Sequence, residues 1–151
     1  MKKLILTTFA ILIAIVSVNA QEIADHAIGL RIADNNGFGT EITYQRALSG
    51  NNRLELDLGW RSYNSEDGFK LAGIYQWVWE LEGDFNWYAG AGGGIGSVNK
   101  AFVFVAGNVG IEYNFDIPLQ LSLDFRPEIN LGNVFDDNLG FDVGLGIRYK
   151  F

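Results

Sequence analysis

Apolar and polar residues alternate along most of the chain. Between Leu139 and Phe151 every second residue is apolar or aromatic, and the residues between them are small or charged. Successive side chains of a β-strand point to opposite faces of a sheet, so this alternation predicts a strand with one apolar and one polar face. The same period of two occurs in eight segments, at 28–33, 38–45, 53–61, 69–81, 85–95, 103–115, 119–131 and 139–151.

Short segments rich in Gly, Asn, Asp and Pro separate these strands. Such residues favour the tight turns of β-hairpins. Eight strands joined by seven short turns predict an all-β, eight-stranded antiparallel up-and-down meander. The expected turns are 34–37, 49–52, 64–68, 82–84, 97–100, 116–118 and 132–138.

A few residues break the alternation. Ile74, Val78, Phe102 and Phe104 fall on the otherwise polar face. We interpret Phe102 and Phe104 as a bulge, or as a sign that the turn expected at 97–100 starts later. Pro127 lies within a predicted strand, and because proline cannot donate to a β-ladder we expect a bulge beside it.

A run of glycines marks the segment from Gly90 to Gly96. It does not match the dinucleotide-binding pattern G-x-G-x-x-G, because Ile95 stands where the third glycine belongs. A glycine within a strand usually marks a close approach. We therefore expect these glycines to make room for long Arg and Lys side chains opposite them.

Charges of both signs occupy the polar face in nearly equal numbers. A buried charge without a partner is very costly, so near balance favours a closed interior in which charges pair. We therefore predict a network of ion pairs inside a barrel. Its members are Arg31, Arg53, Arg61, Lys70, Arg126, Arg148 and Lys150, together with Glu41, Glu55, Asp57, Glu80, Glu112, Asp124, Glu128 and Asp142.

Aromatic residues of the apolar face gather near the strand ends, with mainly aliphatic residues between them. Two aromatic bands around an aliphatic belt are typical of a barrel that faces lipid, and a sandwich core would not sort its aromatic residues in this way. In hydrocarbon such a sheet has to close, because an open edge leaves backbone groups without partners. The predicted aromatic girdle contains Trp60, Trp77, Trp79, Trp87, Tyr113 and Tyr149.

The first twenty residues have a different pattern. Lys2 and Lys3 precede an uncharged, mostly apolar run, 4–18, and small residues stand before Ala20. This pattern is typical of a secretory signal peptide cleaved after Ala20. We therefore expect two parts, a signal peptide at 1–20 and an outer-membrane barrel at 21–151. The absence of cysteine excludes a lipid-modified cysteine, disulfides and thiol chemistry.

The composition also argues against several kinds of function. Without residues 1–20 the chain has nine Lys and Arg against 18 Asp and Glu, a formal charge of −9 and no basic cluster, so we expect no nucleic-acid partner. His26 is the only histidine and lies far from Ser62 in a barrel, which argues against a serine–histidine catalytic site. We expect no enzymatic activity, no cofactor and no metal site.

The C-terminal segment 144–151 carries a family resemblance. It ends in phenylalanine after apolar residues at alternate positions, and we single out Gly144, Ile147, Tyr149 and Phe151. With the eight alternating segments, it resembles the small outer-membrane barrels of the OmpA transmembrane domain and OmpX type, without a periplasmic domain. The resemblance implies that 144–151 is an assembly signal. It also implies export to a Gram-negative outer membrane, outer-membrane lipids as surroundings, periplasmic chaperones and the barrel-assembly machinery as partners, and a monomer.

The sequence leaves three functional hypotheses. The first is a non-enzymatic barrel that supports envelope integrity, its lumen closed by the ion-pair network, since side chains fill an eight-stranded barrel. The second is a small non-specific, porin-like channel, which the glycine-rich segment 85–95 keeps open as an alternative. The third is a surface interaction or adhesion module, which the short turns opposite the termini make less favoured.

Overall fold

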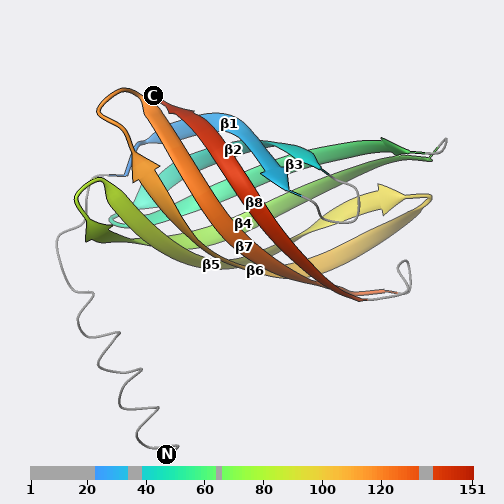
Figure 1. Ribbon diagram of the computed structural model, residues 1–151. Helices are drawn as coiled ribbons and strands as arrows, with labels where there is room; N and C mark the ends of the chain where they lie inside the picture. The colour runs from blue at the N-terminus through green and yellow to red at the C-terminus, as the bar shows by residue number, and fades with distance from the viewer. Residues whose placement is uncertain (1–22, 34–38, 64–65, 133–137) are drawn as a thin grey trace, which may run out of the picture.

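A computed structural model describes residues 23–33, 39–63, 66–132 and 138–151, with only the backbone described at 61–63 and 66. Each strand pairs antiparallel with the next along the chain, and the first pairs with the last, so the sheet closes into a barrel (Figure 1). The predicted all-β, eight-stranded antiparallel barrel is therefore confirmed. Its strands are β1 (His26–Ala33), β2 (Thr40–Ser49), β3 (Asn52–Tyr63), β4 (Glu66–Glu82), β5 (Phe85–Val98), β6 (Lys100–Asn114), β7 (Leu119–Asn130) and β8 (Leu139–Lys150).

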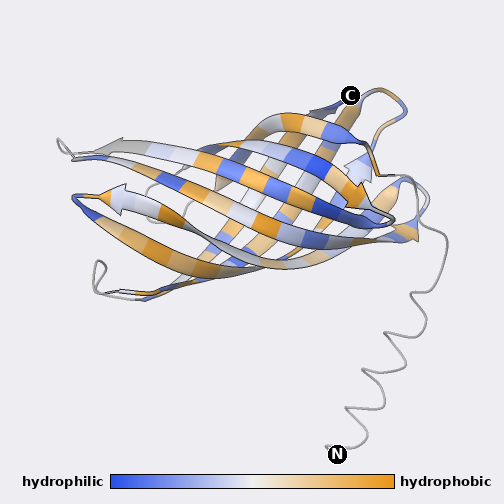
Figure 2. Ribbon diagram, turned by 180° about the vertical axis from the view of Figure 1, so that it is seen from behind, coloured by the Kyte–Doolittle hydropathy of each residue, from blue (hydrophilic) through white to orange (hydrophobic). Residues whose placement is uncertain are grey.

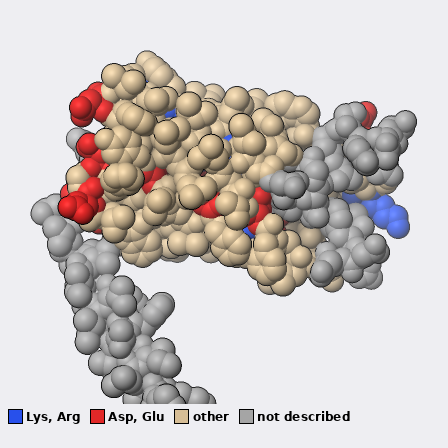
Figure 3. Space-filling view, in the orientation of Figure 1, with Lys and Arg blue, Asp and Glu red and all other residues tan. Residues whose placement is uncertain are grey.

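The alternation of the sequence separates the outside of the barrel from its inside. On β8, Ile147 and Tyr149 are 46% and 56% exposed, whereas Arg148 between them is 1% exposed. Apolar and polar residues alternate along the ribbons in the same way (Figure 2). The outer wall is therefore largely uncharged, and acidic side chains gather at the end of the barrel that carries the C-terminus (Figure 3).

Strands extend furthest into two of the expected turns. β4 begins at Glu66, inside the expected turn 64–68, and β6 begins at Lys100, so that Asn99 alone separates it from β5. Asn99 has a φ of 60°, a left-handed conformation that asparagine tolerates better than most residues. Cross-strand pairing, such as that of Ser62 with Asp67, continues the ladder through residues whose own preference is for turns.

The strand β7 contains no bulge at Pro127, so that prediction was wrong. The pairing of β6 with β7 keeps the same offset on both sides of Pro127. Gly107 explains the fit, because a Cβ there would already lie 3.4 Å from Cγ of the proline ring. Register shifts among the described pairs lie at hairpin ends instead, at Ala47–Ser49 and Glu80–Glu82.

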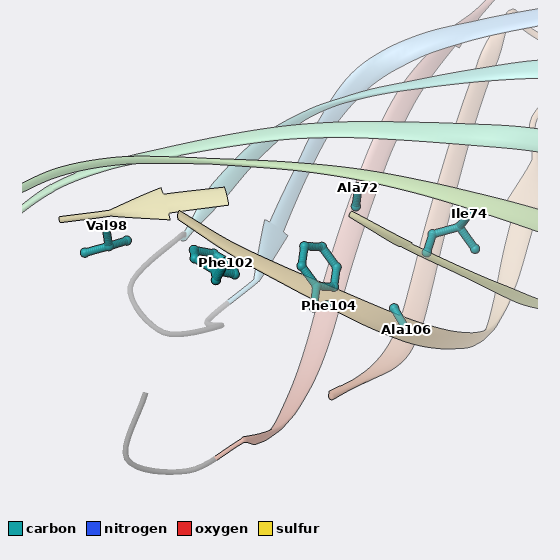
Figure 4. Close-up of a cluster of buried hydrophobic side chains, with 6 residues drawn as sticks. All are labelled: Ala72, Ile74, Val98, Phe102, Phe104 and Ala106. Atoms are coloured by element: carbon teal, nitrogen blue, oxygen red, sulfur yellow. The ribbon is translucent and has the colours of Figure 1, made fainter. Parts of the chain in front are cut away.

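An apolar cluster lines the inside of β4, β5 and β6, formed by Ala72, Ile74, Val98, Phe102, Phe104 and Ala106 (Figure 4). Phe102 and Phe104 therefore point inward from a regular strand, and the expected bulge is wrong. The turn does start later than 97, because β5 continues to Val98. They pair with Gly96 and Gly94. A Cβ on Gly94 would lie 2.7 Å from Cζ of Phe104. Gly94 and Gly96 thus make room for aromatic rings, not for the Arg and Lys side chains that the sequence suggested.

Candidate functional site

Charged side chains fill much of the barrel interior. Twelve of the fifteen predicted network members are at most 3% exposed, and every one of the twelve forms an ion pair. They lie inside because they occupy the polar positions of alternating strands. They are Arg31, Glu41, Arg53, Glu55, Asp57, Lys70, Glu112, Asp124, Arg126, Glu128, Asp142 and Arg148.

Three predicted members stand apart from this network. The side chain of Arg61 lies outside the described residues. Glu80 and Lys150 are partly exposed and form no ion pair among the described side chains. Lys150 instead donates to the backbone oxygen of Phe115 at 3.3 Å. Both lie near strand ends, where water competes with any partner.

Arg31 on β1 holds acids from three other strands. Its Nη2 lies 2.6 Å from Oδ1 of Asp124 on β7. Its Nη1 lies 2.8 Å from Oδ2 of Asp142 on β8 and 3.1 Å from Oε2 of Glu41 on β2. The rigid fork of donors on a guanidinium group suits this arrangement, in which one cation serves several carboxylates.

Arg126 on β7 and Arg148 on β8 extend this arrangement. Arg126 Nη2 lies 2.7 Å from Oδ2 of Asp57, and Nη1 lies 3.3 Å from Oε2 of Glu41. Arg148 Nη2 lies 3.0 Å from Oε2 of Glu55, whose Oε1 is 3.9 Å from Arg126. Shared acids therefore join three arginines into one group, here named the central cluster: Arg31, Arg126, Arg148, Glu41, Glu55, Asp57, Asp124 and Asp142.

Two separate ion pairs flank the central cluster. Arg53 on β3 lies 2.7 Å from Glu112 on β6, and its guanidinium carbon is 4.8 Å from the centre of the Tyr88 ring. Lys70 on β4 lies 2.7 Å from Glu128 on β7. Cation–π contacts of this kind add to the stabilisation of a desolvated cation.

The network also uses neutral side chains that the prediction left out. Gln76 accepts a hydrogen bond from Arg53 Nε at 2.6 Å and donates one to Asn108 at 2.8 Å. Arg148 donates to Thr43 at 3.1 Å and to Ser122 at 2.7 Å. These residues occupy the same alternate strand positions as the charged residues, with side chains that point into the barrel. The alternation itself was therefore the signal that could have identified them.

The network ties opposite walls of the barrel together. Its ion pairs join β1 to β7, β2 and β3 to β7, β3 to β6, and β4 to β7. A buried ion pair contributes little net stability compared with apolar packing, but loss of one partner costs about 3–5 kcal/mol. The arrangement therefore ties β2, β3 and β4 to β6 and β7 through the interior of the barrel.

Aromatic side chains of the predicted girdle lie on the outer wall. Trp79 and Trp87 stack with ring centres 4.4 Å apart, and Tyr113 packs edge-on against Phe85 at 4.8 Å. Trp77, Trp60 and Tyr149 are 42%, 54% and 56% exposed. Trp60 pairs with Phe69 toward the end opposite the termini. The other five lie toward the end that carries the C-terminus.

The only histidine lies at the seam between β1 and β8. His26 Nδ1 is 2.7 Å from the hydroxyl of Tyr44, and its ring stacks on Phe151 at 5.4 Å. Within the described part of the chain, no group of three or more His, Cys, Asp or Glu could hold a metal ion. The described residues also contain no helix that is long and apolar enough to cross a membrane.

A cavity of about 600 Å³ opens at the end of the barrel that carries the C-terminus. Its lining includes Asp25, Asp84 and Asp116, together with Lys150 and Phe151. All of these residues lie at strand ends or in turns.

No protein-family model matches this sequence, and no curated protein matches it. Solved structures do. The N-terminal β-barrel domain of Pseudomonas aeruginosa OprF is similar with a TM-score of 0.66 and 13% identity, over 85% of this chain and 100% of that one. A designed transmembrane β-barrel has a TM-score of 0.64 and 20% identity, over 88% of this chain and 100% of that one.

Neisserial surface protein A is also similar, with a TM-score of 0.61 and 15% identity, over 83% of this chain and 94% of that one. At such identities the likeness shows the fold alone. The resemblance to small eight-stranded outer-membrane barrels is therefore confirmed at the level of the fold.

Proposed function

We propose that this protein is a non-enzymatic outer-membrane barrel that supports the integrity of the cell envelope, with its lumen closed to ions by the charged network. The central cluster carries this proposal. Its three arginines cross the interior from β1, β7 and β8 and are held by five acids on four strands. Side chains so placed leave a barrel of this size without a continuous path.

The outer wall supports a place in a bilayer. Large apolar side chains such as Leu145, Val143 and Ile129 are 50% or more exposed, a costly arrangement in water over so wide a surface. β2 to β8 have 10 to 17 residues each, enough to span the hydrocarbon region when tilted. In this proposal the termini face the periplasm, and export removes residues 1–20.

Biogenesis is part of the same proposal. The C-terminal segment, with Gly144, Ile147, Tyr149 and Phe151, serves as the signal for the barrel-assembly machinery after periplasmic chaperones have delivered the unfolded chain. Ile147, Tyr149 and Phe151 are all exposed on the outer wall, which supports their being accessible to a partner before the barrel closes. The assembled barrel is then a monomer surrounded by outer-membrane lipids.

A small channel is a second candidate function, and one observation favours it. Several buried polar atoms of the lumen have no hydrogen-bond partner among the described residues, including Glu55 Oε1, Tyr88 OH and Arg126 Nε. Buried polar groups of this kind commonly bind water. Together with the cavity at the end that carries the C-terminus, these atoms could form part of a hydrated path.

Single-channel conductance decides between the two functions. The refolded chain 21–151 is inserted into a planar bilayer, and its folding is checked by the gel shift between boiled and unboiled samples. Closure predicts a silent wild type. Lys70→Ser combined with Glu128→Ser removes one balanced pair that crosses the lumen, and this variant is expected to give small steps. Reproducible steps from the folded wild type would overturn closure in favour of the channel.

Cell fractionation tests the location. Expression of the full chain in a Gram-negative host is expected to give an outer-membrane protein whose mass corresponds to a start at Gln21. A chain that retains residues 1–20, or that remains in the inner membrane, would contradict export by a cleaved signal peptide.

A further inference from the structure

One cation of the barrel stands on its outer wall. Arg46 follows Ile42 and Tyr44 on the outward positions of β2, and it is exposed. It is the only Lys or Arg at an outward position of the strand residues that the structure describes. The four buried arginines of the lumen are at most 1% exposed. A charge on the side that faces lipid is costly away from the headgroups, so Arg46 needs an explanation separate from the network.

Arg46 lies at the level of the aromatic girdle, toward the end of the barrel that carries the C-terminus. Its Cα pairs with that of His26 on β1. On the neighbouring row of outward residues, Tyr44 and Tyr149 both pair with Ile28. The rings of such a girdle lie at the level of the lipid headgroups. A guanidinium group at this depth therefore reaches the headgroups while its aliphatic stem covers apolar surface.

No acid among the described residues holds the Arg46 side chain. It forms neither an ion pair nor a hydrogen bond with a described side chain, whereas Arg31 of the lumen contacts three acids. A guanidinium group has five N–H donors and no acceptor, and its planar fork matches two oxygens of a phosphate group. Phosphate is also the anion at the headgroup level of a phospholipid bilayer. The charge and the depth of Arg46 therefore complement a phospholipid headgroup.

His26 stands beside Arg46 as a second polar group of the outer wall. Its Nδ1 lies 2.7 Å from the hydroxyl of Tyr44, and its ring stacks on Tyr44 and on Phe151, with ring centres 6.0 and 5.4 Å apart. When the hydroxyl donates to Nδ1, the ring proton lies on Nε2, which can then donate to a phosphate oxygen. The Cβ atoms of directly paired residues lie about 5 Å apart, so His26 and Arg46 can reach the same headgroup.

We propose that Arg46 and His26 bind the phosphate group of a phospholipid in the leaflet that surrounds this end of the barrel. The acyl chains of this lipid lie along Ile28, Leu30 and Ile42, which are 45%, 45% and 40% exposed on the same two strands. This apolar surface favours a lipid over free phosphate, because burying it releases water. The site rests on the proposed place of the barrel in a bilayer, and it does not depend on whether the lumen conducts.

A titration followed by NMR tests this site. The refolded chain 21–151 is placed in micelles of a maltoside detergent, which contains no phosphate, and dihexanoyl phosphatidylethanolamine is added. We expect the backbone amide signals of His26 and Tyr44 and the Nε–H signal of Arg46 to shift with saturation. The backbone amide of Trp60, toward the opposite end, is expected to stay in place. Dihexanoyl glycerol, which lacks phosphate, and inorganic phosphate are the ligand controls, and both are expected to cause smaller shifts.

Variants of Arg46 show whether its charge holds the lipid. Arg46→Gln is expected to need about tenfold more lipid for half saturation, because it removes hydrogen bonds from a charged donor. Arg46→Lys keeps the charge without the planar fork and is expected to lie between Arg46→Gln and the wild type. Lys150→Gln is the matched control, because Lys150 lies at the same end but lines the cavity and donates to Phe115; its effect is expected to stay within about twofold. The gel shift checks that each variant is folded.

Saturable shifts that require both the phosphate and Arg46 support the site. Equal shifts with dihexanoyl glycerol or with inorganic phosphate overturn it, because apolar contact alone or a soluble anion would then explain them. Equal losses in Arg46→Gln and Lys150→Gln overturn it as well, since the overall charge would then be responsible. No shift in the wild type also overturns it, and a shift that appears only in Glu22→Gln would show that this acid, outside the described residues, holds Arg46 instead. Retention of the chain in the inner membrane would refute the proposed location and leaves the titration unchanged.

Discussion

The guanidinium group of Arg31 on β1 lies directly against the Cα of Gly144 on β8, where a Cβ would stand 2.5 Å from Nε. Arg31 cannot move aside, because Asp124, Asp142 and Glu41 hold its three nitrogens. The most connected cation of the lumen therefore depends on the absence of a side chain on the neighbouring strand.

Gly144→Ala is expected to destabilise the barrel by about 1–3 kcal/mol, the usual cost of overpacking a well-packed interior. The unfolding free energy in urea, measured in lipid vesicles, tests this. Gly73→Ala is the matched control, because its Cβ would point to the outer wall and lie 3.5 Å from the side chain of Leu56, an ordinary contact. Equal effects of the two substitutions would show that Arg31 has room to move.

The ring of Phe104 fills the lumen beside Gly94 and lies 5.0 Å from Nζ of Lys70. Phe104→Ala leaves a cavity and is expected to cost about 3–5 kcal/mol. The neighbouring Val105 is 45% exposed on the outer wall, so Val105→Ala serves as the control and is expected to cost less. Urea unfolding of both variants gives the comparison, and a similar loss for both would contradict a packed interior at Phe104.

Most of the fold follows from the period of two, because the place of a residue in the alternation assigns its side chain to the lumen or to the outer wall. It places Arg31 and Arg126 inside and Ile147 outside, as the structure has them. The alternation also assigned Ile74 to the lumen, where the structure has it. The position of Pro127 was misinterpreted, because its fit depends on Gly107 on the neighbouring strand, and the relative register of two strands cannot be read from one of them.

The partners within the lumen could not be predicted for a related reason. Arg31 and Asp124 are 93 positions apart in the chain, and they meet only because the closed barrel places β1 and β7 across a shared interior. The stagger between neighbouring strands sets the height of each side chain along the barrel axis, and this height decides which side chains meet inside the lumen. Near balance of charges was predicted from all polar positions, whereas the buried network has five cations and seven acids among the described side chains.

A double-mutant cycle on Arg53 and Glu112 measures the coupling across the lumen. Their atoms lie 2.7 Å apart with side chains at most 1% exposed. Arg53→Gln or Glu112→Gln alone leaves a buried charge without its partner and is expected to cost about 3–5 kcal/mol. The double variant is expected to cost less than either single variant, because no charge remains to be compensated.

Urea unfolding of the four proteins provides the cycle. Lys150→Gln is the control, because Lys150 is partly exposed and forms no ion pair among the described side chains; its effect is expected to stay within about 0.5 kcal/mol. Additive costs of the two single variants would mean that Arg53 and Glu112 do not depend on each other.

Phe151 has two separable roles at the seam of the barrel. Its backbone exchanges two hydrogen bonds with His26, of 3.2 and 2.9 Å, and its ring stacks on the histidine at 5.4 Å. The stacking contributes about 0.5–1.5 kcal/mol. Either His26→Ala or Phe151→Ala removes it, and His26→Ala also removes the hydrogen bond to Tyr44, so this variant is expected to lose at least as much stability as Phe151→Ala in refolded samples.

Assembly in cells is expected to distinguish the two variants. If the barrel-assembly machinery reads the terminal aromatic residue, Phe151→Ala lowers the amount of folded barrel in the outer membrane severalfold, whereas His26→Ala leaves it close to the wild type. The heat-dependent gel shift of outer-membrane fractions measures this amount. Equal yields of the two variants would show that Phe151 acts through seam packing alone, because the stability that they share would then account for the whole effect.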